Sequence, residues 1–202
     1  IRFHHLELRN SAVFGGTMYG DTILLSAGKT YELDPDAILL GREYIQMIGN
    51  NCTPIELKSK FSGRQADLVT DMGVVKADFV QMQDIRAVGD IDFYAGIHST
   101  DIANNTNWIF DSAEEFVDEG FLGQDIVLCD ANTITLNANN FNPNETYTWQ
   151  DGSSDSTFVT NQPGLFFVEV MFTNNCSIRD SVRIIPQQDF QPNLPDTTSI
   201  LC

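Results

Sequence analysis

Short runs of β-forming residues, separated at close intervals by Gly, Asn and Asp, fill the first 110 residues and constrain the fold more than any other feature. Almost no helical periodicity runs through this region. The runs predict strands at 3–8, 22–25, 38–40, 44–48, 54–57, 66–69, 74–82 and 91–94. Strands at this spacing suit either a β-sandwich or a coiled parallel solenoid.

The solenoid is the favoured arrangement for this first region. Alternation is clearest at Val75, Ala77 and Phe79, and residues 80–85 continue it with a shift of face, which indicates a bend between strands. Two-residue Asn-Gly or Asp-Gly turns, typical of hairpins, are absent from the first 110 residues. We therefore expect an all-β chain that opens with a β-helix-like domain.

A second all-β pattern carries Cys129, Trp149, Gly152 and Cys176. A Cys129–Cys176 bridge would fasten the two ends of a small sandwich, and closing such a loop is worth roughly 3 to 5 kcal/mol. Trp149 lies where an immunoglobulin-like sandwich buries a large ring between its sheets. The alternative is an ordinary core tryptophan with two unpaired thiols.

Charge and hydropathy exclude several partners. The net charge is -17 with only 11 Lys and Arg residues and no basic stripe, which argues against nucleic acid. No run approaches 18 apolar residues, so no membrane span is expected, and a signal peptide would lie outside these 202 residues. Four cysteines in a chain rich in Asn, Thr, Ser and Asp favour an oxidising, extracellular setting.

The chain divides into a β-helix-like domain at 1–111, a short linker or helix at 112–119, an immunoglobulin-like repeat at 120–186, and a linker that starts another repeat at 187–202. Ser112 and Glu115 form a capping box, although a plain acidic linker is the alternative. The pattern restarts at Leu201 and Cys202, so we expect a piece of a longer string of modules. Cys202 is equivalent to Cys129, and Cys52 is either free or buried.

The stretch from 51 to 110 resembles a segment that recurs in large secreted surface proteins of Bacteroidota. Its motifs are a Cys-x-Pro-Ile run, a Val-x-x-Asp-Phe-Val strand, a Gly-x-x-x-Phe-x-Ala run and a closing Ser-x-Asp-x-Ala-Asn-Asn-x-x-Trp. The matching residues are Cys52, Pro54, Ile55, Val75, Asp78, Phe79, Val80, Gly89, Phe93, Ala95, Ser99, Asp101, Asn104, Asn105 and Trp108. The resemblance implies a β-helix-like region and export by the type 9 secretion system.

The second domain resembles the tandem immunoglobulin-like repeats of gliding-motility-associated and other type 9 secreted proteins. The residues that fit the repeat are Leu128, Cys129, Tyr147, Trp149, Gly152, Gly164, Val168, Val170, Asn175, Cys176, Asp180 and Val182. A weaker resemblance, to the Bacteroidota O-glycosylation motif of Asp followed by Ser or Thr, implies modified hydroxyls. The candidate hydroxyls are Thr22, Ser112, Ser156, Ser181 and Thr197.

Catalytic residues are hard to find in the sequence. His4 and His5 are neighbours on a strand and His98 stands alone in a loop, with no triad order or nucleophile elbow. Glycoside hydrolysis by a carboxylate pair is the alternative chemistry, and the available acids lie close together in the sequence. These acids are Asp78, Asp84, Asp90 and Asp92, and the favoured interpretation is that they are turn and solvent-face residues of an acidic protein. We expect no enzyme activity.

No cofactor is expected, with calcium as the one metal that the sequence leaves open. The loop from 99 to 107 offers Asp101, Asn104, Asn105 and Asn107 as oxygen ligands, but not in EF-hand order. Asx-turns and Asn ladders explain the same residues without an ion. Neither a zinc-ligand spacing nor the Lys-Ser/Thr of a P-loop is present.

These features together predict a non-catalytic segment of a secreted protein at the cell surface, attached to the outer membrane. It would serve as an adhesin, stalk or filament in surface attachment or gliding, with surface polysaccharide or other surface proteins as partners. The alternative is a polysaccharide-binding region of a secreted carbohydrate-active enzyme. That alternative requires Tyr19, Tyr31, Tyr44 and Tyr94 to present exposed rings on one face.

Overall fold

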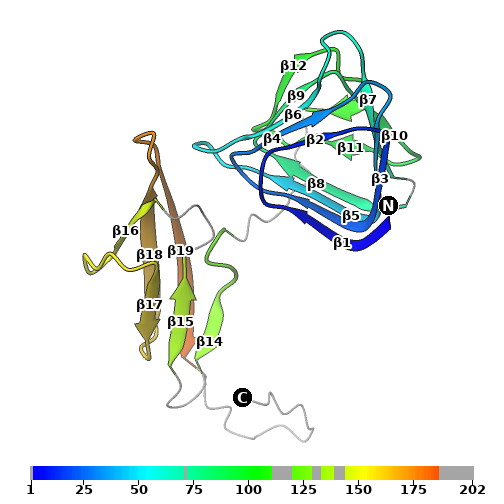
Figure 1. Ribbon diagram of the computed structural model, residues 1–202. Coiled ribbons are helices and arrows are strands. Elements are labelled where there is room, and N and C mark those ends of the chain that lie inside the picture. Colours follow the sequence, from blue (N-terminus) through cyan, green and yellow to red (C-terminus); the bar gives the residue numbers. More distant parts are fainter. Residues whose placement is uncertain (1, 71, 111–119, 129–132, 139–143, 187–202) are drawn as a thin grey trace, which may run out of the picture. The chain divides into compact units, whose positions relative to one another are not determined.

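The computed structural model describes residues 2–70, 72–110, 120–128, 133–138 and 144–186 (Figure 1). Every regular element in these ranges is a strand, so the prediction of an all-β chain is confirmed. The chain separates into two compact units, 1–116 and 117–202, and each is considered by itself. The helix predicted at 112–119 lies outside the described residues. Within the described ranges no helix is long and apolar enough to cross a membrane.

Parallel sheets build the first unit. The six-stranded sheet contains β1 (Arg2–Leu8), β3 (Thr17–Leu25), β5 (Ile38–Ile48), β7 (Ala66–Val69) and β10 (Ile85–Val88), with β8 (Val74–Asp78) also pairing β5. The five-stranded sheet contains β2 (Ala12–Phe14), β4 (Thr30–Leu33), β6 (Ile55–Ser59), β9 (Val80–Gln83) and β12 (Thr100–Ala103). Short β11 (Phe93–Tyr94) pairs β13 (Trp108–Ile109), also in parallel.

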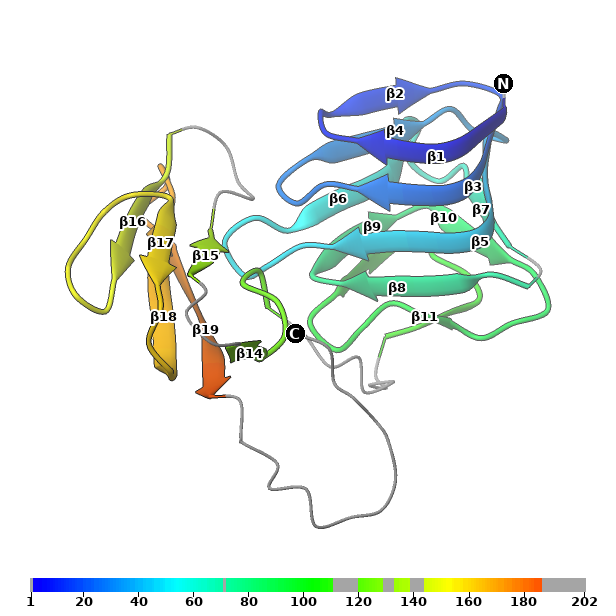
Figure 2. The same ribbon diagram turned by 90° about the horizontal axis from the view of Figure 1, so that it is seen from below.

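Successive strands of each sheet stack above one another, as β1, β3, β5 and β8 do in Figure 2. Because each pair is parallel and in register, like side chains fall into columns. Leu6, Ile23, Ile45 and Val75 hold paired positions on these strands, and the last three are buried. Burying each such side chain contributes roughly 1.5 to 3 kcal/mol. The alternation of side chains therefore fixes which face of each strand lines the interior.

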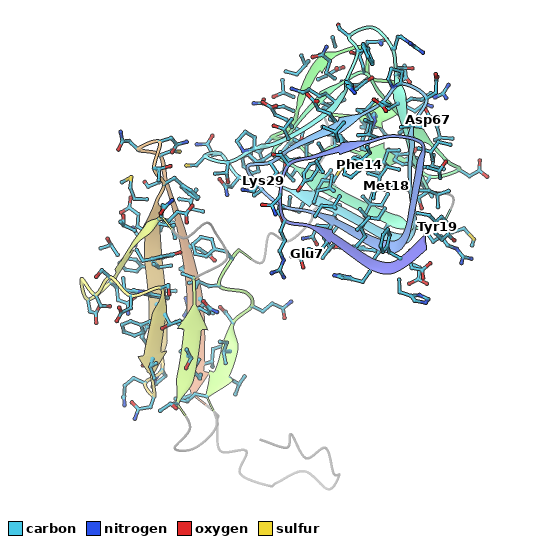
Figure 3. All side chains as sticks on the ribbon, in the orientation of Figure 1. Glu7, Phe14, Met18, Tyr19, Lys29 and Asp67 are labelled. Atoms are coloured by element: carbon cyan, nitrogen blue, oxygen red, sulfur yellow. The ribbon has the colours of Figure 1, made fainter. Side chains whose placement is uncertain are left out.

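The core of the first unit lies between its sheets. Phe14 and Met18 point into this interior from β2 and β3 (Figure 3). Tyr31 on β4 and Leu57 on β6 are paired neighbours and almost fully buried. The phenol of Tyr31 donates a hydrogen bond to the Leu8 carbonyl oxygen at 2.5 Å, which satisfies its polar end.

Several predicted strand boundaries are wrong. The strand predicted at 22–25 begins earlier, because β3 spans Thr17–Leu25. The predicted strand at 74–82 is broken at Phe79, whose φ of 52° separates β8 from β9, and this break is the predicted bend. The predicted strands at 38–40 and 44–48 are one strand, β5, which bends at a register shift against β3. An L residue in the left-handed region costs about 1 to 2 kcal/mol, so local contacts must hold Phe79 there.

The second unit consists of two sheets. The four-stranded sheet runs in the order β14 (Ile126–Leu128), β19 (Ser177–Pro186), β18 (Gly164–Met171) and β16 (Thr146–Trp149), with β14 parallel to β19 and the other pairs antiparallel. The two-stranded sheet pairs β15 (Ile134–Asn137) with β17 (Thr157–Thr160) in antiparallel fashion.

Aromatic rings connect these two sheets. Trp149 is 1% exposed, and its ring lies 5.2 Å from that of Phe158 on β17, which in turn lies 5.6 Å from Phe166 on β18. The indole N–H of Trp149 donates to the Asp155 carbonyl oxygen at 2.8 Å. Such aromatic clusters bury large apolar areas while keeping polar ends satisfied. Trp149 is therefore the central core residue of this unit.

Disulfide chemistry is present in both units. Cys52 and Cys176 are each disulfide-bonded, and the described residues include no free cysteine. The alternative of a free Cys52 is therefore wrong, because this residue is both buried and bonded. Cys129 and Cys202 lie outside the described residues, so the predicted Cys129–Cys176 pairing stays a prediction.

Candidate functional site

The sequence-predicted acids lie at the turns of the first unit, beginning with Asp78 at the end of β8. Its Oδ1 accepts hydrogen bonds from the backbone N–H groups of Phe79 and His98, both at 3.0 Å. Its Oδ2 lies 2.8 Å from His98 Nδ1. The His98 ring stacks on Phe79, with centroids 4.4 Å apart and planes inclined by 3°. The interpretation of His98 as an isolated loop residue is therefore wrong.

An Asp–His pair is the base and orienting part of a catalytic triad, so its neighbours matter. The adjacent hydroxyl belongs to Ser99, whose Oγ donates to the Ala95 carbonyl oxygen at 2.6 Å and accepts from Val80 N–H at 2.8 Å. These bonds commit the hydroxyl to the backbone of the turn. The group made by Asp78, His98 and Phe79 holds the β8–β9 corner against the loop that follows β11, and its contacts describe a structural clamp.

Asp84 holds the next corner, between β9 and β10. It is 1% exposed, has φ 58°, and accepts hydrogen bonds from Gly63 N–H, Gln83 Nε2 and Asn104 Nδ2. A buried carboxylate needs such donors, because it loses its hydration on folding. Asp84 therefore serves as a fixed acceptor that binds its own corner to two other segments of chain, at Gly63 and Asn104.

The other two acids of the predicted catalytic group are exposed. Asp90 and Asp92 lie in the connection between β10 and β11, and the phenol of Tyr94 donates to Asp92 at 3.5 Å. The contacts of the four acids run to backbone N–H groups, amides, an imidazole and a phenol. This arrangement matches the turn and solvent-face alternative rather than a pair of carboxylates that share a substrate.

The predicted calcium loop forms an asparagine ladder. Asn105 accepts from Ile85 N–H at 2.9 Å and donates to Met82 O at 2.8 Å and to Asp101 Oδ1 at 2.6 Å. Asn107 donates to Ala87 O at 2.9 Å. The amides therefore continue the parallel pairing where strands end, as the Asx alternative predicts. No group of three or more His, Cys, Asp or Glu in the described ranges has a metal-holding arrangement.

The remaining two histidines lie on the edge strand β1. His4 Nδ1 lies 2.7 Å from Asp21 Oδ2, and Arg42 lies 4.0 Å from the other oxygen of the same carboxylate. Asp21 is nearly buried, whereas His4 and His5 are exposed. These contacts form a polar column across β1, β3 and β5, at the bend of the six-stranded sheet.

The four tyrosines proposed for sugar binding do not form an exposed set. Tyr31 is fully buried, and Tyr19, Tyr44 and Tyr94 are half-buried on β3, β5 and β11. Burial raises the pKa of the Tyr31 and Tyr44 phenols above the ordinary value. The criterion set from the sequence, burial of the four rings, is met by Tyr31 alone.

The candidate glycosylation hydroxyls differ in accessibility. Thr22 is half-buried on β3 between β1 and β5, and Ser156 is half-buried before β17. Ser181 is exposed on β19. Ser112 and Thr197 lie outside the described residues. Ser181 therefore offers the most accessible described hydroxyl of the five.

Two structural features were not predicted from the sequence. The Asp78–His98 contact spans 20 residues, and nothing local in the sequence signals it. The second feature is the outward face of the four-stranded sheet, where Leu165 is 57% exposed. Alternation along 164–171 could have identified that face.

Searches of known proteins complete the description. No family model, curated protein or solved structure matches this chain.

Proposed function

We propose that this chain is a non-catalytic segment of a secreted cell-surface protein, which acts as an adhesin or stalk in surface attachment. In this proposal the first unit is a three-sided parallel β-solenoid and the second an immunoglobulin-like sandwich. Export by the type 9 system and a role in gliding rest on the sequence resemblance to Bacteroidota surface proteins.

The strand pairings support the solenoid. Strands of the six-stranded and five-stranded sheets alternate along the chain, and each pairs in parallel with a strand about one circuit later. The long strands β3 and β5 bend in the middle, at 20–22 and 41–44, so each supplies two sides of the coil. Corners at Phe79 and Asp84 then supply the turns to and from the third side.

The aromatic core supports the sandwich. Trp149 and Phe166 from the four-stranded sheet meet Phe158 from the two-stranded sheet, which is how two packed sheets share one core. Disulfide-bonded Cys176 lies in the turn between β18 and β19 and directly precedes β19. A fastened strand end is typical of small extracellular sandwiches.

The observation that carries the functional proposal is that each unit contains a disulfide-bonded cysteine, Cys52 in the first and Cys176 in the second. Such bonds persist in oxidising compartments outside the cytosol. The acids and amides expected to do chemistry instead hold corners, as Asp78, Asp84 and Asn105 do. A net charge of -17 adds repulsion that keeps neighbouring copies apart.

Surface labelling in the native organism tests the proposal. Antibodies against the purified chain should label intact cells, and deleting the gene should reduce attachment to surfaces without slowing growth. A strain carrying the restored gene is the control. Labelling only after lysis, or full attachment by the deletion strain, would contradict the proposal. A glycan array with the purified chain distinguishes the two hypotheses. Specific polysaccharide binding would favour the alternative, a polysaccharide-binding region of a secreted carbohydrate-active enzyme.

A further inference from the structure

One face of the second unit is apolar, exposed and differently charged from the rest of the chain. It is the outward face of the four-stranded sheet, opposite the Trp149 core. Along β18 and β19 the side chains alternate, so that Phe166, Val168, Val182 and Ile184 are buried while their neighbours point outward. The outward set on the three strands that carry the apolar residues is Val127, Leu165, Phe167, Glu169, Met171, Ser177, Arg179, Ser181, Arg183 and Ile185. We call this set the outer face.

Large apolar side chains occupy much of the outer face. Leu165 is 57% exposed, Val127 54%, Met171 40% and Ile185 39%. Val127 and Ile185 are paired neighbours across β14 and β19. Phe167 is half-buried, and the Arg179 guanidinium lies 3.8 Å from its ring centroid. Contiguous exposed apolar groups beside a stacked arginine are typical of protein-binding surfaces.

The charges of the outer face are unlike those of its surroundings. Residues 111–202 contain 14 acidic side chains and two basic ones, and both basic ones, Arg179 and Arg183, belong to the outer face. Glu169 is paired with Arg179 across the sheet, and the Asp125 carboxylate accepts a hydrogen bond from Arg183 N–H at 2.8 Å. With Asp125 included, the outer face carries two basic groups, Arg179 and Arg183, and two acidic groups, Glu169 and Asp125. Its net charge is therefore zero.

From these observations we infer that the outer face binds the outer face of a second copy of this chain, in a two-fold symmetric, face-to-face pair. Two chains of charge -17 repel each other over most of their surfaces, and the neutral outer face is where they can approach. A two-fold axis near Phe167 brings Arg179 and Arg183 of one copy toward Glu169 and Asp125 of the other. Leu165, Ile185 and Val127 of one copy then pack against the apolar residues of the other, as isologous interfaces require.

The dimensions of the sheet set the expected strength. The four strands have three, four, eight and ten residues; at about 4.8 Å between strands and about 3.4 Å per residue they give a face on the order of 400 Å². Twice that area is smaller than a standard specific interface, so the dimer should be weak, with a dissociation constant in the micromolar range. Because net repulsion opposes association, added salt should strengthen the dimer, whereas it would weaken binding of an acidic ligand to Arg179 and Arg183.

Sedimentation of the full, oxidised chain tests the inference, over about 1 to 300 µM and at about 0.05 and 0.5 M NaCl. The wild type should dimerise reversibly and more tightly at high salt. Leu165→Glu should weaken dimerisation at least tenfold. Val159→Glu is the matched control, because Val159 is 61% exposed on β17, away from the outer face, and this variant should dimerise like the wild type.

Thermal unfolding and near-ultraviolet circular dichroism check that the variants fold. If Leu165→Glu does not fold, Arg183→Glu replaces it, because that exposed side chain can be changed without entering the core. The inference is overturned by a wild type that stays monomeric at both salt concentrations, by Leu165→Glu dimerising as tightly as the wild type, or by equal losses in Leu165→Glu and Val159→Glu. Binding of polyglutamate by a monomeric wild type would overturn it in favour of an acidic partner.

Discussion

Single polar residues in the first unit act as fixed acceptors that bring separate segments of the chain together. Asp78 binds the loop that follows β11, and Asp84 binds two other segments to the β9–β10 corner. Asn105 accepts a hydrogen bond from the backbone of Ile85 at the start of β10 and donates one to the backbone of Met82 on β9. Residue types that a sequence reader assigns to catalysis or metal binding are here bound to the backbone.

Asp84→Ala should destabilise the folded chain by about 3 kcal/mol or more. The change leaves Gly63 N–H and the Asn104 amide without their acceptor and puts Ala at a positive φ. Asp84→Asn should lose less, because Asn tolerates the left-handed region and keeps an acceptor oxygen. Urea unfolding measures both. Exposed Asp90→Ala is the control, expected within about 0.5 kcal/mol of the wild type, and a similar value for Asp84→Ala would refute the corner role.

Tyr31 should make the chain less stable in alkaline solution. Its pKa is raised by burial in the folded state, so the folded chain holds the phenol proton more tightly than the unfolded chain. Stability is therefore complete below the unfolded pKa, near 10, and falls as pH rises toward the folded pKa. The urea midpoint should drop above about pH 10, and less so in Tyr31→Phe. Equal alkaline losses in both proteins would show that Tyr31 is not responsible.

At the scale of strands, the corners between β8, β9 and β10 set the direction of the chain, and a glycine is needed beside one of them. Gly96, which follows β11, has φ +84°, and a Cβ there would meet the Ala77 carbonyl oxygen and the Asp78 carboxylate. Gly63, between β6 and β7, has a similar φ of +82° with open space around it. The two positions thus separate backbone strain from steric contact.

Gly63→Ala should cost about 1 kcal/mol, from the left-handed backbone alone. Gly96→Ala should cost about 3 kcal/mol or more, because the added methyl group also pushes the Asp78 clamp apart. Urea unfolding of both variants at neutral pH gives the comparison. Equal costs would mean that the corner yields easily and that Asp78 does not hold it rigidly.

Strand alternation was enough to predict much of the first unit but not its pairing. The run at 66–69 coincides with β7, because Ala66 and Leu68 alternate with polar or half-exposed neighbours. Strands β2, β4, β10, β12 and β13 were not predicted, since two to four residues carry too little alternation to stand out. β4 is buried at Tyr31 and Leu33 because of β6, whose pairing residues lie 26 positions later. Such a contact leaves no local signal.

For the whole molecule, the sequence could indicate the fold class and the oxidised cysteines better than the contacts between distant segments. Composition predicted an acidic, all-β chain with oxidised cysteines, and the cysteines described are bonded. The Asp78–His98 clamp could not be predicted, because its residues lie 20 positions apart. Alternation marks the outward residues of β18, but the neighbours of that face on other strands, such as Val127 beside Ile185, could not be predicted. Charge balance on one sheet face emerges only when strands are placed side by side.

Disulfide mapping tests the organisation of the entire chain. We expect peptides of the unreduced protein to contain a Cys129–Cys176 link, because this bond would join the start and the end of the second unit. Removing it by Cys129→Ser with Cys176→Ser should cost roughly 3 to 5 kcal/mol, since the cross-link restricts the unfolded chain. Mass spectrometry before and after reduction locates the link, and urea unfolding gives the cost. A link from Cys176 to any cysteine other than Cys129 would refute this pairing.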